Sequence, residues 1–528
     1  MTASRTRGVA AVLPLGAVLT VLAVLVSGCG LFGAGGSSPA GQGSTRSPTP
    51  SSRPAPAPVP GGPVPAGLAS YYAQRLHWTS CRDTFECARL RVPLDYARPG
   101  GRSIRLALLK APALDPARRL GSMVVDPGGP GASGVDYAAG ATTSFGRPLR
   151  EVYDVVGLDP RGVGASSPID CVSDARLSRM FAYDPDPDTA AERRTLDGMY
   201  RALGRGCLRH DPALTRHMST AEVARDLDIL RSALGDRRLT YFGASYGTEI
   251  GAAYAARFPR RVGRMVLDGA VDPSASSLEF DLVQARGFER ALRSYVGACV
   301  AAGSCFLGGS VDAGVRRVQG LLAATEDRPL PSRYGPVTKG MVDLGVTGAL
   351  YSTAYWPVLD RAIQQGLAGD GTLLQLLADG YLRRDPDGRF QSNLFEAYFA
   401  VTCLDEDDGV SMAEVHRYVP RFERASPTFG RMSAYALPMC HDWPVRSGQT
   451  AHRLDVTKAP PILVVGTTRD PATPLVWAQS LSRQLHGSVL VTRDGDGHTG
   501  YHQGSPCVDN AVEDYLVKGT VPSKDVSC

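Results

Sequence analysis

The run Leu239–Thr248 constrains this chain most, because an apolar, strand-like segment leads there into Gly243-Ala244-Ser245-Tyr246-Gly247. A helix-forming segment, 249–258, follows at once. A serine on so sharp a turn between strand and helix needs small neighbours, which Gly243 and Gly247 supply. The turn also aims the serine oxygen away from the sheet and places a helix N-terminus beneath it. The pattern predicts that Ser245 is a nucleophile; the alternative is an ordinary exposed serine in a glycine-bounded turn.

Strand-like and helix-like segments alternate on both sides of this turn. The strand-like segments are 104–109, 121–126, 153–158, 264–268, 461–466 and 488–491, and the clearest helices are 220–234 and 477–485. Between 273 and 451 the pattern is mostly helical. Alternation that resumes after a helical block predicts an α/β fold, with a mostly parallel, doubly wound sheet and an inserted, largely helical cap domain.

The length of 528 residues suits one large domain with an insertion, or two domains. We expect five parts: a lipoprotein signal peptide at 1–28, a Gly/Ser/Pro-rich tether at 29–66, the N-terminal part of the core at 67–272, the cap at 273–451, and the C-terminal part of the core at 452–528.

The first residues have the features of a targeting segment. Arg5 and Arg7 precede an apolar run, 9–26, which closes with Ser27-Gly28-Cys29. Small residues before an isolated cysteine resemble the bacterial lipoprotein signal, in which cleavage leaves a lipidated Cys29. An uncleaved membrane anchor and an ordinary secretory signal are the alternatives. We therefore expect a protein that is lipid-anchored on the extracellular face of the cell membrane, or secreted.

Cysteine usage also favours export. Without Cys29, ten of the eleven cysteines remain, an even number that indicates disulfides in an exported chain. Pairing neighbours in order would close five local loops, although sequence alone does not fix the connectivity: Cys81 with Cys87, Cys171 with Cys207, Cys299 with Cys305, Cys403 with Cys440, and Cys507 with Cys528. A zinc site is the competing interpretation, but no CxxC spacing occurs among these ten, and we expect no metal.

A nucleophilic serine needs a base, and the base needs an acid to orient it. Asp470 and His498 each follow a predicted strand of the resumed core, and the order Ser, Asp, His along the chain is the one expected of α/β-hydrolases. His502 is the competing base and Asp268, which also ends a strand, is the competing acid.

A glycine-rich loop, 127–134, follows the strand-like segment 121–126. Such a loop could bring backbone N–H groups close to a developing oxyanion in acyl transfer. A phosphate-binding loop is the alternative, but no Gly-Lys-Ser/Thr follows and Pro130 removes a donor. The net charge of +5 without a basic block argues against nucleic acid as a partner. We expect no cofactor, and the sequence does not determine an oligomeric state.

These motifs together are similar to the tripeptidyl aminopeptidase and proline iminopeptidase group of α/β-hydrolases, and most to its secreted or lipoprotein members from actinobacteria. The resemblance covers about 68–528 and is carried by Gly243-Ala244-Ser245-Tyr246-Gly247, Pro127-Gly128-Gly129-Pro130-Gly131, Asp470-Pro471-Ala472-Thr473-Pro474 and Gly497-His498. Proline iminopeptidases carry His where Pro127 stands, which favours the tripeptidyl branch.

The resemblance implies a role for each matched residue. Ser245 would be the nucleophile, Asp470 the orienting acid and His498 the general base. The N–H groups of Tyr246 and Gly129, and less surely Gly128, would form the oxyanion hole. The implied substrate is a peptide or protein.

Removal of N-terminal residues requires recognition of a free α-ammonium group, for which carboxylates suit. The expected cap offers an acidic run after Cys403, and we take Asp405 and Glu406 as the candidate substrate-binding residues. A solvated acidic loop is the structural alternative. The favoured function is an exported aminopeptidase that releases short peptides such as tripeptides; a lipase, esterase or endopeptidase of the same fold, and a binding protein without activity, are the alternatives.

Overall fold

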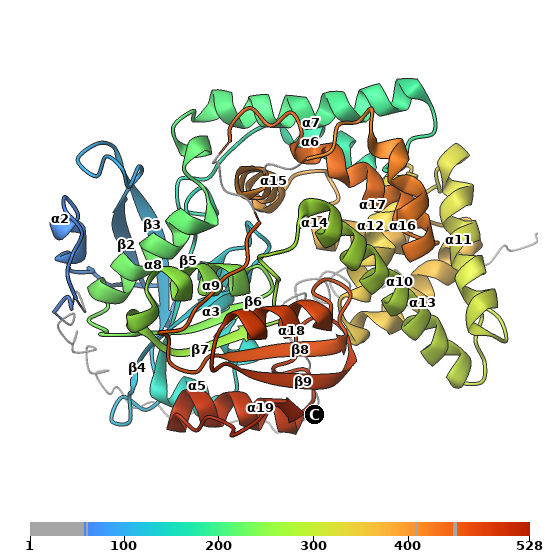
Figure 1. The fold of residues 1–528 in the computed structure, drawn as a ribbon. Coiled ribbons are helices and arrows are strands. Elements are labelled where there is room, and N and C mark those ends of the chain that lie inside the picture. The colour runs from blue at the N-terminus through green and yellow to red at the C-terminus, as the bar shows by residue number, and fades with distance from the viewer. Residues whose placement is uncertain (1–56, 60–61, 407–408, 447–450) are drawn as a thin grey trace, which may run out of the picture.

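The computed structural model describes residues 57–59, 62–406, 409–446 and 451–528. Its centre is one ten-stranded sheet with the order β1-β2-β3-β5-β4-β6-β7-β8-β9-β10 (Figure 1). The strands β1, β2, β3 and β5 pair antiparallel in that order, and every other pairing is parallel. The expected α/β-hydrolase fold with a mostly parallel sheet is confirmed.

The expected strands are present with shifted ends, and the sheet contains three strands that were not expected, Thr79–Cys81, Phe85–Pro93 and Val526–Ser527. The strands are β1 (Thr79–Cys81), β2 (Phe85–Pro93), β3 (Ser103–Ala111), β4 (Gly121–Asp126), β5 (Tyr153–Leu158), β6 (Leu239–Ala244), β7 (Val262–Asp268), β8 (Leu463–Arg469), β9 (Val489–Asp496) and β10 (Val526–Ser527). In β4 and β5 every residue is buried. Continuous apolar runs of this kind belong to parallel strands that are covered on both faces.

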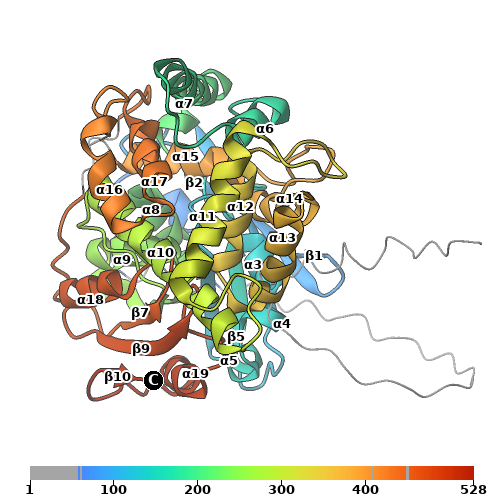
Figure 2. The same ribbon diagram turned by 90° about the vertical axis from the view of Figure 1, so that its right-hand side faces the viewer.

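Helices cover both faces of the sheet (Figures 1 and 2). One buried cluster joins the sheet to α2 (Ala69–Tyr72), α8 (Thr220–Ala233), α9 (Gly247–Arg257) and α18 (Leu475–Gln484). A second cluster lies on the other face, with α3 (Gly134–Ala139), α5 (Arg147–Val152) and α19 (Pro506–Glu513). The short α4 (Ala141–Ser144) follows α3. Two apolar layers therefore fix the strand ends, on which the candidate site depends.

Between β7 and β8 the chain forms a helical block with its own buried cluster. Its helices are α10 (Ser277–Ala301), α11 (Val311–Asp327), α12 (Lys339–Leu350), α13 (Trp356–Leu367), α14 (Thr372–Leu382), α15 (Leu394–Asp405), α16 (Val419–Ala425) and α17 (Gly430–Ala436). We call this block the cap. Its exact limits, like the other expected domain boundaries, stay predictions.

A second helical excursion, between β5 and β6, lies against the cap. It contains α6 (Asp174–Ala182) and α7 (Ala190–His210), and Figure 1 shows α7 running along the top of the molecule above α15. In α6, Phe181 packs edge-on against Phe395 of the cap, with ring centroids 4.8 Å apart. Lys339 of α12 donates to Asp186, in the connection between α6 and α7, at 2.5 Å. Segments on both sides of the turn that contains Ser245 therefore build the helical layer.

The ten cysteines of the described chain form five disulfides, in the order expected from pairing neighbours: Cys81–Cys87, Cys171–Cys207, Cys299–Cys305, Cys403–Cys440 and Cys507–Cys528. Within the described ranges, no helix is long and apolar enough to cross a membrane. The expected signal peptide, Cys29 and most of the tether lie outside the described residues.

Candidate active site

Ser245 lies on the turn between β6 and α9, with a φ of 56°. A positive φ is strained for a residue with a side chain, and such strain is typical of functional turns. The turn leaves no room for other side chains: a Cβ on Gly243 would lie 2.3 Å from the Gly247 carbonyl oxygen, and one on Gly247 would lie 2.7 Å from that of Asp126. The sequence motif therefore reflects a steric requirement.

Three further polar residues follow the strands next to β6. Asp268 ends β7, Asp470 comes directly after β8, and His498 comes shortly after β9. Because β6, β7, β8 and β9 are parallel neighbours, their carboxyl ends meet at one edge of the sheet. The topology thus brings Ser245, Asp268, Asp470 and His498 to the same edge.

Asp470 orients the imidazole of His498. Both carboxylate oxygens of Asp470 lie 3.0 Å from His498 Nδ1. Asp470 is 1% exposed and also accepts the N–H groups of Ala472, Thr473 and Thr499 at 2.8–2.9 Å. Hydrogen bonds of this number fix the position of the Asp470 side chain. The arrangement leaves Nε2 of His498 as the nitrogen that can exchange a proton with a substrate or nucleophile.

The pKa of His498 is raised above 6.5. Burial alone would lower this pKa, but the charge and hydrogen bond of Asp470, with the charge of Asp268, outweigh it. A base with a raised pKa accepts a proton more readily, while a larger share of it is already protonated at neutral pH.

Asp268 supports the site without touching the imidazole. Its backbone carbonyl accepts the N–H of Ser245 at 2.8 Å, and its carboxylate accepts the N–H groups of Gly500 and Tyr501 at 2.7 and 2.9 Å. Burial raises the pKa of Asp268 to about 6. In the described chain the His498 ring bonds instead to Asp470 and to Thr473. The geometry therefore favours Asp470 over Asp268 as the orienting acid.

His502, the competing base, lies on the surface. Its side chain is exposed and its backbone N–H donates to Asp509. Its ring contacts that of Tyr501, with centroids 5.7 Å apart. The structure pairs His498, and not His502, with the buried carboxylate.

The glycine-rich loop lies directly against the nucleophile turn. At Gly128, whose φ is 92°, a Cβ would lie 2.7 Å from the Tyr246 nitrogen and 3.0 Å from Ser245 Cβ. The Gly128 N–H already donates to Asp126 at 2.8 Å. The N–H groups of Gly129 and Tyr246 donate to no protein acceptor in the described part of the chain. Of the three expected donors, Gly129 and Tyr246 are thus the two available to a ligand oxygen.

The two candidate acids at the end of α15 have different contacts. Asp405 accepts from the Thr220 backbone at 3.0 Å and from its hydroxyl at 2.6 Å, and burial raises the pKa of Asp405 to about 7. Thr220 Oγ1 also lies 2.5 Å from the Tyr246 hydroxyl, so Asp405 is connected to the nucleophile turn. Glu406 accepts from the Ser277 hydroxyl at 2.8 Å.

A third carboxylate, Glu249, belongs to the same group but was not among the residues expected from sequence. It lies in the first turn of α9, four residues after Ser245. Burial raises the pKa of Glu249 to about 8, with further contributions from the charges of Asp405 and Glu406. Its carboxylate has no hydrogen-bond partner in the described chain. Its position one helical turn after the nucleophile was the only signal in the sequence.

The cap also contacts this edge of the sheet through His498. The His498 backbone N–H donates to the Tyr351 carbonyl at 2.8 Å, directly after α12. The Tyr351 ring packs edge-on against the imidazole, with centroids 5.5 Å apart. No group of three or more His, Cys, Asp or Glu side chains that could hold a metal ion occurs among the described residues.

Comparison with known proteins finds relatives over most of the chain. It is 37% identical over 478 residues to "Serine protease Hip1" of Mycobacterium tuberculosis, covering 86% of this chain and 91% of the relative. "Carboxylesterase B" of the same species is 35% identical over 496 residues, covering 89% and 92%. "Tripeptidyl aminopeptidase" of Streptomyces lividans is 32% identical over 479 residues, covering 88% of each chain. The family model described as "TAP-like protein" matches residues 426–528.

Proposed function

Because this chain belongs to the tripeptidyl aminopeptidase-like α/β-hydrolases and is a serine hydrolase, we propose that it is an exported peptidase that removes short peptides, tripeptides among them, from free N-termini. The observation that carries the proposal is the pairing of His498 with the buried Asp470, at the same sheet edge as the strained turn of Ser245.

In the proposed reaction, Ser245 Oγ attacks the scissile carbonyl while His498 Nε2 takes its proton. Asp470 holds the imidazole with Nδ1 protonated and stabilises the imidazolium that forms. The N–H groups of Gly129 and Tyr246 donate to the oxyanion of the tetrahedral intermediate. His498 then gives its proton to the leaving amine. Water, activated by the same histidine, hydrolyses the acyl-enzyme and frees Ser245.

The group of Glu249, Asp405 and Glu406 supports selection for a free N-terminus. Burial raises the pKa of Glu249, and the negative charges of Asp405 and Glu406 raise it further because like charges repel one another. A substrate ammonium placed among them would offset that repulsion and supply hydrogen-bond donors. Glu249 links this group to the nucleophile, because one turn of α9 separates the two.

Export is supported by two features. The N-terminal sequence has the form of a lipoprotein signal ending at Cys29, and five disulfides suit an oxidising compartment. We place the enzyme on the extracellular face of the cell membrane, held by a lipid on Cys29.

An esterase is the second candidate, and the similarity to a relative named "Carboxylesterase B" favours it. The catalytic residues would be the same, since acyl transfer to serine serves esters and amides alike. The two functions differ in what the cap recognises.

The test is a substrate panel on the purified protein: a tripeptide p-nitroanilide with a free N-terminus, its N-acetylated form, and p-nitrophenyl esters. The proposal expects the free peptide to be cleaved with a kcat/KM at least about tenfold above that of the acetylated one. Equal rates on both peptides would contradict aminopeptidase activity and favour an endopeptidase. Cleavage of the esters alone would favour the esterase.

A further inference from the structure

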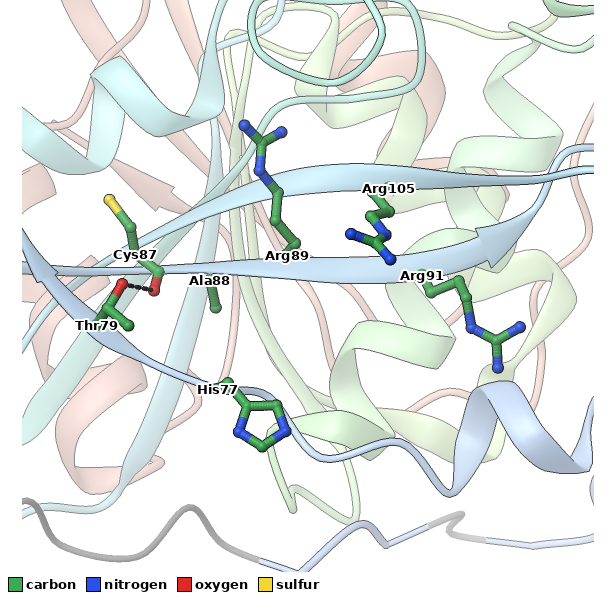
Figure 3. Close-up of a pocket in the computed structure, with 7 residues that line it drawn as sticks. All are labelled: His77, Thr79, Cys87, Ala88, Arg89, Arg91 and Arg105. Atoms are coloured by element: carbon green, nitrogen blue, oxygen red, sulfur yellow. Dashed lines mark hydrogen bonds between the residues drawn. The ribbon is translucent and has the colours of Figure 1, made fainter.

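A groove of about 520 Å³ opens beside β1 and β2, in a part of the chain that the proposed reaction does not use (Figure 3). Its lining is strongly basic for its size: His77, Thr79, Cys87, Ala88, Arg89, Arg91 and Arg105. The volume falls within the range of about 300–1,000 Å³ that small-molecule sites usually have.

The groove exists because β1 covers only part of β2. The pairing of β1 with β2 ends at Cys87. Further along β2, the side chain of Gln74 binds the edge of the strand as a neighbouring backbone would. It accepts from the Arg91 N–H at 2.9 Å and donates to the Arg91 carbonyl at 2.8 Å. Between these two contacts, the backbone that precedes β1 does not pair with β2.

Three arginines on one face of β2 and β3 supply the charge. Arg89 and Arg91 are two residues apart on β2, and Arg105 of β3 lies directly opposite Arg91. Like charges at directly opposed positions of an antiparallel pair destabilise the sheet. No carboxylate forms an ion pair with any of the three within the described ranges. A bound anion would remove this repulsion.

The nearby acids are already paired with other cations. Glu86, on β2, pairs with Lys110. In the turn between β2 and β3, Asp95 pairs with Arg98 at 2.8 Å, while Arg102 binds Asp211 at 2.6 Å. The groove therefore keeps its positive charge although acidic residues surround it.

Two of the arginines are held in place by neutral groups. The Arg91 guanidinium lies over the ring of Tyr71, 4.4 Å from its centroid. Arg89 donates to the Ala165 carbonyl at 2.5 Å. Arg105, which is exposed, has no hydrogen-bond partner in the described chain. Such positioning lowers the entropic cost of binding an anion.

We propose that this groove binds the phosphate of an anionic phospholipid headgroup at the membrane surface. Guanidinium groups suit a phosphate because they present paired donors in a planar fork. The commitment to a lipid rests on the anchor in the proposed function, since Tyr71 lies in α2, directly after the expected tether 29–66.

The tether makes even a weak headgroup contact effective. On the expectation that residues 29–66 form a tether, an anchored domain stays close to the bilayer. Binding to the headgroup is then intramolecular and is favoured by a high effective concentration. Each basic side chain near an anionic leaflet adds further attraction. The groove would orient the domain on the membrane.

The test measures binding of dibutyryl-phosphatidylglycerol, a water-soluble lipid, to the mature protein by phosphorus NMR, with dibutyryl-phosphatidylcholine and inorganic phosphate as comparison ligands. The double variant Arg91→Gln/Arg105→Gln should bind the anionic lipid at least about tenfold more weakly. The control Arg316→Gln/Arg317→Gln removes the same charge from the exposed face of α11 and should bind as the wild type does.

Equal binding of the two lipids, or no loss in the groove variant, would overturn the proposal. Inorganic phosphate that binds as tightly as phosphatidylglycerol would overturn the assignment to a lipid. Thermal unfolding of both variants controls for folding. Peptide hydrolysis, measured on the same samples, separates the two proposals: an active enzyme that binds no lipid contradicts only the groove, while lipid binding without peptidase activity contradicts only the proposed function.

Discussion

The sheet edge and the cap fix their polar residues by different means. At the edge, the backbone and carboxylate of Asp268 and the carboxylate of Asp470 bind backbone N–H groups of neighbouring turns. In the cap, Asp405 and Glu406 accept side-chain hydroxyl groups of other segments, together with one backbone N–H, that of Thr220, near the disulfide of Cys403. Backbone contacts depend on the fold, whereas side-chain contacts depend on the residues at each position. We therefore expect the edge to carry the chemistry and the cap to select the substrate.

Two of the contacts between these regions lie beside the candidate site. The His498 N–H donates to the Tyr351 carbonyl of the cap. Thr220 connects Asp405 with the hydroxyl of Tyr246, beside the nucleophile. Changes in the cap can therefore reach the sheet edge.

The largest effect is expected at the edge. Ser245→Ala should lower kcat on peptides and esters alike by about 10⁴-fold or more, because it removes the nucleophile common to both. Steady-state kinetics on both substrates, with thermal unfolding as the control for folding, measures this. Retained ester cleavage would show that another residue acts as the nucleophile.

A smaller loss is expected from Asp268→Asn, which keeps the shape of the side chain but removes its charge. The kcat should fall about 10–100-fold on every substrate with little change in KM, because the turns of Ser245 and His498 lose a shared support. The negative charge of Asp268 raises the pKa of His498. Since the neutral imidazole is the active form, the acid limb of the pH–rate profile should move to lower pH.

A matched control is Asp154→Asn. Asp154 is also a buried carboxylate that accepts a backbone N–H, that of Ala113 at 2.9 Å, but it lies at the opposite end of the sheet, near the start of β5. This variant should leave the acid limb in place. An equal shift in both variants, or none in Asp268→Asn, would contradict the positioning role of Asp268.

The group of Glu249, Asp405 and Glu406 should affect only one class of substrate. Glu249→Gln, Asp405→Asn and Glu406→Gln are each assayed on a free tripeptide anilide, its acetylated form and p-nitrophenyl acetate. Loss of a charge-assisted hydrogen bond to the ammonium should lower kcat/KM for the free peptide at least about tenfold. The ester should be nearly unaffected. If each variant loses activity on all three substrates alike, these acids maintain the structure of the site. They would then not select the substrate.

The smallest effect on turnover is expected from the N-terminus. Cys29→Ala should release the protein from lipid anchoring and leave kcat on peptides unchanged within about twofold, because the expected tether, 29–66, lies between the anchor and the site. Mass spectrometry of the mature N-terminus, with peptide kinetics on the same sample, measures both. An unlipidated N-terminus at another residue in the wild type would contradict the anchor.

The sequence predicted the sheet edge well because strands and their ends leave local signals. The motif around Ser245, and polar residues directly after apolar strands at Asp470 and His498, reflect topology that any parallel sheet imposes. The neighbour pairing of the cysteines was also a correct prediction.

Contacts between segments far apart in the chain leave no local signal of this kind in the sequence. Asp268 ends its strand, as a candidate acid would. Only the folded structure reveals that the turn after β9 reaches the end of β7, where Asp268 accepts the N–H groups of Gly500 and Tyr501. The charge interaction between Glu249 and Asp405 depends on where the end of α15 lies relative to α9, which neither helix encodes alone. The packing of α6 and α7 against the cap likewise joins parts of the chain far apart in sequence.

The central claim is that Ser245 is the nucleophile and that His498 activates it. The most direct measurement is labelling with a fluorophosphonate, followed by mass spectrometry of the digested protein at a fixed time. The account predicts one adduct, on the peptide that contains Ser245, and its loss or strong reduction in His498→Gln. An adduct on another residue, or undiminished labelling of Ser245 in His498→Gln, would contradict the account.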